Sequence, residues 1–143
     1  MAYCTQTDLE AAAELQLLID LTDDEKTGSI NATRLTRAIV DADATIDGHL
    51  RARYSVPLAS TPAYIRKLSV DLTLHALYSR RSSQFELPQG IRDRYRSAMD
   101  ALRAMRDGKL DLGVEPPPAA SAAIVADVKG PERLCTADTM KDF

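Results

Sequence analysis

The polar stretch at residues 23–31 holds the sequence's best arrangement of metal-ligating oxygens. Counted from its first aspartate, oxygen-bearing side chains stand at the first, third, fifth and ninth positions of a calcium-loop pattern: Asp23, Glu25, Thr27 and Asn31. Gly28 falls at the sharp-turn position, but Arg34 occupies the twelfth, where a bidentate glutamate should complete the ligand set. A cation there removes most of the affinity for calcium. The sequence therefore predicts an acidic turn that caps the following helix, with no metal and no cofactor.

Histidine and cysteine, the other residues that could do chemistry, have no suitable partners nearby in the sequence. His49 and His75 lie 26 residues apart in expected helices, and neither has a short-spaced second ligand. Cys4 and Cys135 stand in terminal segments without a neighbouring histidine, which disfavours a thiol nucleophile. The glycines are too scattered for a phosphate-binding loop. We expect a protein that is not an enzyme.

Two groups of charged residues remain as possible contact surfaces. The acids are Asp41, Asp43 and Asp47, and the arginines include Arg80, Arg81, Arg92 and Arg96. Such runs are usually solvated, and nearby acids partly neutralise these arginines. The alternative is an interface made of bidentate arginine–carboxylate pairs. If the acidic side of one copy met the arginines of the next, a ring could close head to tail.

Helices must position these residues, because the apolar composition is mainly alanine and leucine. The chain has 143 residues, of which 45% are hydrophobic and 5% aromatic, enough for one domain with an aliphatic core. Its net charge of -3 disfavours a generally basic surface for nucleic acid. No apolar run approaches the ~20 residues that span a bilayer, and the first residues lack a signal-peptide pattern. We expect an all-α domain that does not enter a membrane.

Periodicity and capping residues predict the first two helices of a small bundle. Thr7 and Glu10 have the spacing of a capping box and start a helix that ends near Leu21. Asn31 caps a second helix, whose apolar residues recur at spacings of three and four as far as about Tyr54.

Two further helices complete a bundle of about four helices between residues 7 and 107. The third runs from residue 63 to about Arg80 and is apolar on most of its circumference, which is typical of a central helix. The fourth has Pro88 in its first turn and ends at Gly108.

The last segment differs in composition from the predicted helical domain, residues 1–114. Three consecutive prolines at 116–118 stop any helix. The segment then carries apolar residues, among them Ile124, Val125, Val128 and Phe143. It is too apolar for a solvated tail and too short to fold alone. We expect residues 115–143 to form an extended C-terminal arm that docks on another chain, with residues 124–128 pairing as a strand.

Several segments, in their order and spacing, resemble the head–tail connector (neck, or adaptor) proteins of Mu-like tailed phages and prophages. They are Met-Ala-Tyr at 1–3, Leu-Ile-Asp-Leu-Thr-Asp at 18–23, Ala-Asp-Ala-Thr-Ile-Asp-Gly-His-Leu-Arg-Ala-Arg-Tyr at 42–54, Val56-Pro57-Leu58, Leu77-Tyr78, Arg94-Tyr95 and Asp107-Gly108-Lys109. The resemblance covers about residues 1–114. The loop at 23–31 departs from the family's more regular pattern of aspartate and glycine, which sets aside any inherited metal site.

The resemblance implies a structural protein with a helical-bundle fold and no enzymatic activity. Such proteins form a homo-oligomeric ring of twelve subunits beneath the portal protein, at the neck of the virion. The ring extends the DNA channel and presents a platform to tail-completion or tail-terminator proteins. Contact with packaged DNA would be transient and non-specific. Assembly would take place in the bacterial host cytoplasm, with no membrane involved.

The rival hypothesis is a small helical DNA-binding regulator that uses the arginines of the third and fourth helices. The sequence shows no helix-turn-helix pattern, and its net negative charge counts against this function.

Overall fold

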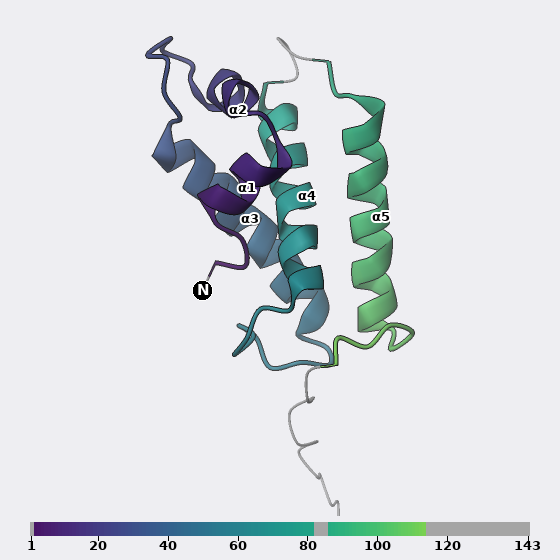
Figure 1. Ribbon diagram of the computed structural model, residues 1–143. Coiled ribbons are helices and arrows are strands. Elements are labelled where there is room, and N and C mark those ends of the chain that lie inside the picture. The colour runs from purple at the N-terminus through teal and green to yellow at the C-terminus, as the bar shows by residue number, and fades with distance from the viewer. Residues whose placement is uncertain (1, 82–85, 114–143) are drawn as a thin grey trace, which may run out of the picture.

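The computed structural model describes residues 2–81 and 86–113. Within these residues the chain forms five helices and no strand (Figure 1): α1 Gln6–Ala12, α2 Leu15–Thr22, α3 Ala32–Leu50, α4 Ala63–Arg80 and α5 Gln89–Arg106. The predicted all-α fold is confirmed. The predicted arm, including its strand at 124–128, lies outside the described residues, and the division at residue 114 stays a prediction.

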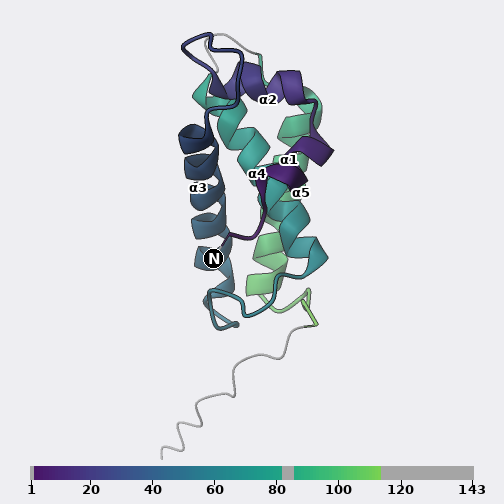
Figure 2. The same ribbon diagram turned by 60° about the vertical axis from the view of Figure 1, so that its left-hand side comes forward.

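The helices α3, α4 and α5 form a bundle in which α4 runs antiparallel to α3 and α5 and packs against both, while α3 and α5 also contact each other (Figures 1 and 2). The predicted third helix is α4, and its apolar side chains are buried around most of the helix: Ile65, Leu68, Val70, Leu72, Leu74 and Leu77. In α5 a single stripe faces the bundle, with Ala98, Leu102 and Met105 buried. The placement of α4 in the centre follows from this difference in apolar circumference.

The N-terminal region forms two helices, so the prediction of one continuous helix is wrong. The chain is extended at Ala13, between α1 and α2. Leu9 and Leu18 are nine residues apart, or about 2.5 turns of a helix, so one straight helix would place them on opposite sides. Both are buried in one apolar cluster. The break lets α1 and α2 each turn their leucines inward.

The capping box of α1 is also two residues earlier than expected. Thr5, not Thr7, is the N-cap, and its side chain accepts from the backbone N–H of Asp8. The Asp8 side chain in turn accepts from the Thr5 backbone N–H at 2.8 Å. Asp8 therefore fills the position that the sequence assigned to Glu10.

The start of α3 is confirmed, but its end is not. The Asn31 side chain accepts from the Arg34 backbone N–H at 3.1 Å, as expected of an N-cap. The helix stops at Leu50 rather than near Tyr54, because the chain turns there: the backbone N–H groups of Arg53 and Tyr54 both donate to the Leu50 carbonyl. Residues 51–62 form a loop that includes the cis peptide bond before Pro57.

The ends of α5 follow the expected residues closely. Pro88 is the N-cap, one position ahead of the first turn. Gly108 follows the helix with a φ of 76°, a left-handed conformation that glycine adopts without strain. The Arg53 guanidinium fills the space that a Cβ at Gly108 would need, so the loop after α3 packs on the end of α5.

The core consists of two apolar clusters, one at each end of the bundle. One joins the last turns of α3 to the start of α4 and the end of α5, and it includes Tyr3, Tyr54 and Leu58. The other joins α1 and α2 to the start of α3 and the end of α4, and it includes Cys4. Adjacent residues of the N-terminal segment thus enter different clusters. None of the helices within the described ranges has the length and apolarity needed to cross a membrane.

Candidate functional site

Residues 2–5, here called the N-terminal strap, are fixed to the bundle through the carboxylate of Asp43. The Tyr3 backbone N–H donates to Asp43 Oδ2 at 3.1 Å, and the Ser69 hydroxyl of α4 donates to Oδ1 at 3.0 Å. Only 8% of Asp43 is exposed, and this burial raises the pKa of its carboxyl group, opposed in part by the two hydrogen bonds. The expectation that Asp43 lies on an exposed acidic side of its helix is therefore wrong. It joins the strap to α3 and α4.

The Tyr3 phenol makes a second connection, between α3 and the loop after it. Its hydroxyl donates to Asp47 Oδ1 and accepts from the Leu58 backbone N–H, the latter at 3.2 Å. Burial and the bond to Asp47 raise the pKa of Tyr3 to about 12. Asp47 is half-buried, and this carboxylate is occupied within the chain. Of the three acids predicted to form an interface, Asp41 alone stays fully exposed.

Three arginines meet at the end of α2 and form what we call the Asp24 cluster. Asp24 accepts from Arg80 Nη1 at 2.7 Å and lies 3.3 Å from Arg34 Nη2 and 3.6 Å from Arg81 Nε. The same arginines donate to backbone carbonyls at the carboxyl end of α2. Arg34, for example, donates to the Thr22 carbonyl at 3.0 Å. Cations at this end of a helix satisfy its last carbonyls and its dipole. Arg80 and Arg81, predicted as interface residues, are thus bonded within their own chain.

The acidic loop is held in shape by its own oxygens. Asp23 accepts from the backbone N–H groups of Glu25 and Gly28, at 3.1 and 2.7 Å. Thr27 bonds to Ser29, and Asn31 caps α3. Arg34 lies 3.7 Å from Glu25, so the residue at the twelfth position supplies positive charge. Within residues 2–81 and 86–113, no group of three or more His, Cys, Asp or Glu side chains is placed to hold a metal ion.

The remaining predicted interface arginines lie on the outside of α5. Arg92 and Arg96 are exposed, on the side of the helix away from Ala98 and Leu102. Arg92 donates to the Leu87 carbonyl at 3.2 Å. The predicted interface residues of the arm, Ile124, Val125, Val128 and Phe143, lie outside the described residues. The structure therefore brings none of the predicted acids together with the predicted arginines.

One histidine, His75, and one thiol, that of Cys4, take part in packing. His75 of α4 stacks on Tyr95 of α5 with ring centroids 3.9 Å apart, and its burial lowers the pKa of the imidazole. The Cys4 thiol is buried near the Thr73 hydroxyl, and burial raises its pKa, which disfavours a reactive thiolate.

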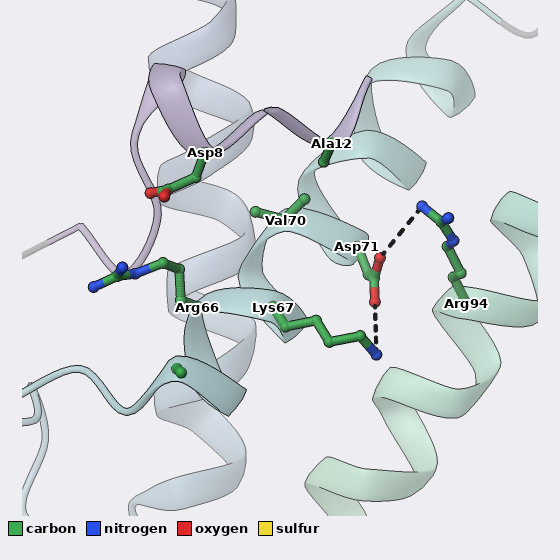
Figure 3. A pocket seen from close by; sticks show the side chains of 8 residues that line it. Asp8, Ala12, Arg66, Lys67, Val70, Asp71 and Arg94 are labelled. Carbon is green, nitrogen blue, oxygen red and sulfur yellow. Dashed lines mark ion pairs between the residues drawn. The ribbon is translucent and has the colours of Figure 1, made fainter. Parts of the chain in front are cut away.

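A groove between α1, α4 and α5, which the sequence did not reveal, has a volume of about 400 Å³. Figure 3 shows Asp71 of α4 in it, between Lys67 of the same helix and Arg94 of α5, with ion-pair distances of 3.8 and 4.0 Å. Only 7% of the Asp71 side chain is exposed, whereas more than half of each cation is. The lining residues are Asp8, Ala12, Ala63, Arg66, Lys67, Val70, Asp71 and Arg94. We call this the α1/α4/α5 groove.

One signal in the sequence pointed to Asp71 and to the Asp43 site, although not to the groove around Asp71. Ser69, Asp71 and Thr73 alternate with apolar residues in the buried middle of α4, between Leu68 and Leu74. Polar residues in such a helix require partners, because a buried polar group without a hydrogen bond is costly. Ser69 bonds to Asp43, and Thr73 bonds to the Ser69 carbonyl at 2.7 Å.

Comparison with known proteins identifies the family of the chain. Residues 3–128 match the model of the family described as Bacteriophage Mu, Gp36. The chain belongs to the Mu Gp36 family. It is also similar to a protein of Escherichia phage Mu named Gene product J, with 32% identity over 123 residues, which cover 85% of this chain and 83% of the relative.

Membership of the Mu Gp36 family confirms the predicted likeness to a Mu-like phage protein and extends it along the chain. The matched range includes all five helices of the described residues and continues to residue 128. The resemblance inferred from sequence motifs ended at about residue 114. The Gp36 family likeness therefore includes the first part of the predicted C-terminal arm.

Proposed function

We propose that this chain is the head–tail connector, or neck protein, of a Mu-like tailed phage or prophage. Its copies would form a ring, of twelve subunits in the assembled particle, between the portal protein and the tail-completion or tail-terminator protein. The ring would continue the channel through which DNA passes. The observation that carries the proposal is the match to a phage Mu family along residues 3–128.

The chemistry of the described residues supports assembly as the role. Three polar groups that could have formed a reactive site serve internal contacts instead: Asp43 holds the strap, His75 stacks on Tyr95, and Cys4 is buried beside Thr73. The exposed residues of α3 and α5 carry charges of both signs. Such surfaces suit specific contact between proteins more than the binding of a small substrate.

DNA binding as a regulator receives less support from the structure. Arg80 and Arg81, two of the arginines that this hypothesis needs, donate to the end of α2 and to Asp24. Contact with DNA in the proposed role would be with the phosphate backbone, because the DNA must slide past the ring.

Mass measurement of the full chain, alone and with the portal protein of the same phage, tests the proposal. We expect a smaller species alone and a ring of twelve copies on the portal. Electron microscopy of particles should place the ring between capsid and tail. A chain that never joins the portal, and that binds one preferred DNA sequence in footprinting, would support the regulator instead.

The C-terminal arm has a separate test. A chain truncated after residue 114 should keep its helicity and unfolding temperature but lose stable attachment to the portal, because the arm would supply the docking contacts. Particles assembled at normal yield with the truncated chain would show that the arm is dispensable.

A further inference from the structure

We propose that the α1/α4/α5 groove receives the outer face of α3 from the neighbouring copy, with Val40 and Asp41 as the residues that enter it. This inference rests on the ring of the proposed function and assigns the two surfaces by which its subunits meet.

The groove has positive charge that the chain itself does not balance. Three cations, Arg66, Lys67 and Arg94, face two carboxylates. Asp8 is already bonded to the backbone N–H and hydroxyl of Thr5, at 2.8 and 2.7 Å. Within the described residues Arg66 makes no ion pair. An incoming carboxylate would therefore find Arg66 on the Asp8 side of the groove, while Lys67 and Arg94 remain paired with Asp71 (Figure 3).

The walls of the groove also offer apolar surface for a small side chain. Ala12, Ala63 and Val70 come from α1 and α4 and line it together with the aliphatic stems of the longer cations. The fitting residue pair is thus an aliphatic side chain with an acid beside it.

The outer face of α3 carries such a pair. Val40 is 56% exposed, the most exposed of the large apolar side chains among the described residues, and Asp41 next to it is exposed as well. Arg37 lies one turn before Asp41, is exposed, and makes no ion pair in the part of the chain that the structure describes. When Asp41 approaches Arg66, Arg37 is placed to meet Asp8 through Oδ1, because both bonds from Thr5 go to Oδ2. The two surfaces therefore match in both apolar contact and charge.

The two surfaces lie on different sides of the molecule. In Figure 2, α3 is on one side of α4, and α1 and α5 are on the other. The view into the groove in Figure 3 has α3 behind α4. A contact between two different surfaces of identical subunits is heterologous, and repeated contacts of this kind close a ring when the rotation allows. The geometry thus agrees with a cyclic assembly rather than a two-fold dimer.

A protein surface suits this groove better than a DNA backbone does. Asp71 and Asp8 would repel closely spaced phosphates, and the apolar lining would gain nothing from them. An aliphatic side chain beside a single carboxylate uses both the lining and the cations.

Charge exchange between full-length chains tests the assignment. Asp41→Arg alone and Arg66→Glu alone should each lower the fraction of rings on the portal protein by about tenfold or more, because like charges then meet at every contact. An equal mixture of the two variants should restore ring formation, since alternating copies again pair opposite charges and a ring of twelve has an even number of contacts. Both residues are exposed, so circular dichroism and the unfolding temperature should match those of the unaltered chain.

Asp100→Arg is the matched control, because Asp100 is an exposed acid on the outer side of α5. This variant should assemble normally. If Asp100→Arg prevents assembly while Asp41→Arg does not, the interface uses α5 and the inference is wrong. Mixed variants that stay unassembled would also overturn it. Failure of the unaltered chain to form rings would instead reject the proposed function. If Arg66→Glu loses affinity for a plain DNA duplex but assembles normally, the groove contacts DNA.

Discussion

The N-terminal strap and the Asp24 cluster both tie the early part of the chain to the bundle, but they do so in different environments. At the strap, Asp43 and Tyr3 are buried, and the carboxylate accepts from an amide and a hydroxyl. At the Asp24 cluster, one carboxylate faces three guanidinium groups, and 37% of its side chain is exposed.

The number of charges at each place is a poor guide to its stabilising effect. Exposed ion pairs contribute little, because water solvates the separated charges well and salt screens them. A buried hydrogen bond contributes modestly to the free energy of unfolding. Removing one partner is costly, however, because the other is left buried with neither water nor protein to bond to. The strap is held by two carboxylates, those of Asp43 and Asp47, and we expect it to contribute more to folding than the cluster.

The largest effect should come from Asp43→Ala. This change leaves the Tyr3 N–H and the Ser69 hydroxyl buried without their acceptor, and each unsatisfied group costs about 1–3 kcal/mol. We expect the free energy of unfolding, measured by urea titration, to fall by about 3 kcal/mol.

Asp41→Ala is the matched control for this prediction, since Asp41 lies two residues earlier on the exposed side of α3. Its effect on the free energy of unfolding of the isolated chain should stay within about 0.5 kcal/mol. If both variants lost the same free energy of unfolding, the proposed difference between the buried Asp43 and the exposed Asp41 would be contradicted.

Tyr3→Phe should have a smaller effect than the loss of Asp43. The ring still fills its place in the core, but Asp47 and the Leu58 N–H lose the hydroxyl between them. We expect a loss of about 1–2 kcal/mol in the free energy of unfolding. Tyr64→Phe, at an exposed tyrosine of α4, should leave stability unchanged.

The same tyrosine should make the fold sensitive to alkali. The pKa of Tyr3 rises from an ordinary 10.0 to about 12 in the folded chain. Its stabilising contribution is therefore complete below pH 10 and is lost as the pH rises through 12. Absorbance of tyrosinate should show an ionisation step at a pH of about 12, and Tyr3→Phe should remove both this step and the associated loss of stability.

The smallest effect should come from Asp24→Asn. Because Asp24 is exposed, the loss of stability should be below that of Tyr3→Phe. It should disappear at about 1 M salt, where the screening length is about 3 Å. The bond from Arg80 lowers the pKa of Asp24, so its contribution is present above pH 3.8 and is lost as the pH falls through the lowered value. The pKa of Asp43 shifts in the opposite direction to that of Asp24. Because it is raised, the folded chain favours the protonated form of Asp43. The comparison would be reversed if the loss of stability caused by Asp43→Ala depended on salt while the loss caused by Asp24→Asn did not.

The helices that could be predicted from the sequence are those whose signals are local. Asn31 caps α3 through a residue three positions away, and the apolar circumference of α4 indicates its central place without any knowledge of its neighbours. The separation of α1 from α2 could not be predicted in this way. It depends on a third element that buries Leu9 and Leu18 together, which helical periodicity does not report.

The candidate surfaces were harder to predict, because the type and position of a charged residue in the sequence do not show which residue it pairs with. Asp41 and Asp43 stand on one helix, yet Asp43 bonds to an amide 40 residues away and Asp41 remains exposed. Arg80 and Arg81 likewise meet Asp24, an acid more than 50 residues earlier in the chain. Asp71 could be recognised as unusual in an apolar helix, but its groove is built by α1 and α5, and the sequence gives no account of their distance from α4.

The position of Tyr3 in the core also has a consequence for the order in which the protein folds during synthesis. Tyr3 and Cys4 leave the ribosome before the residues to which they bond, Asp43, Leu58 and Thr73, which follow them by 40, 55 and 69 residues. At cellular rates of translation that interval lasts on the order of ten seconds. During this time the residues that bury the Tyr3 ring and the Cys4 thiol in the folded chain have not yet been made. Tyr3 and Cys4 therefore wait for partners that are made long after them, and any host factor that shields nascent apolar segments would meet them in this interval.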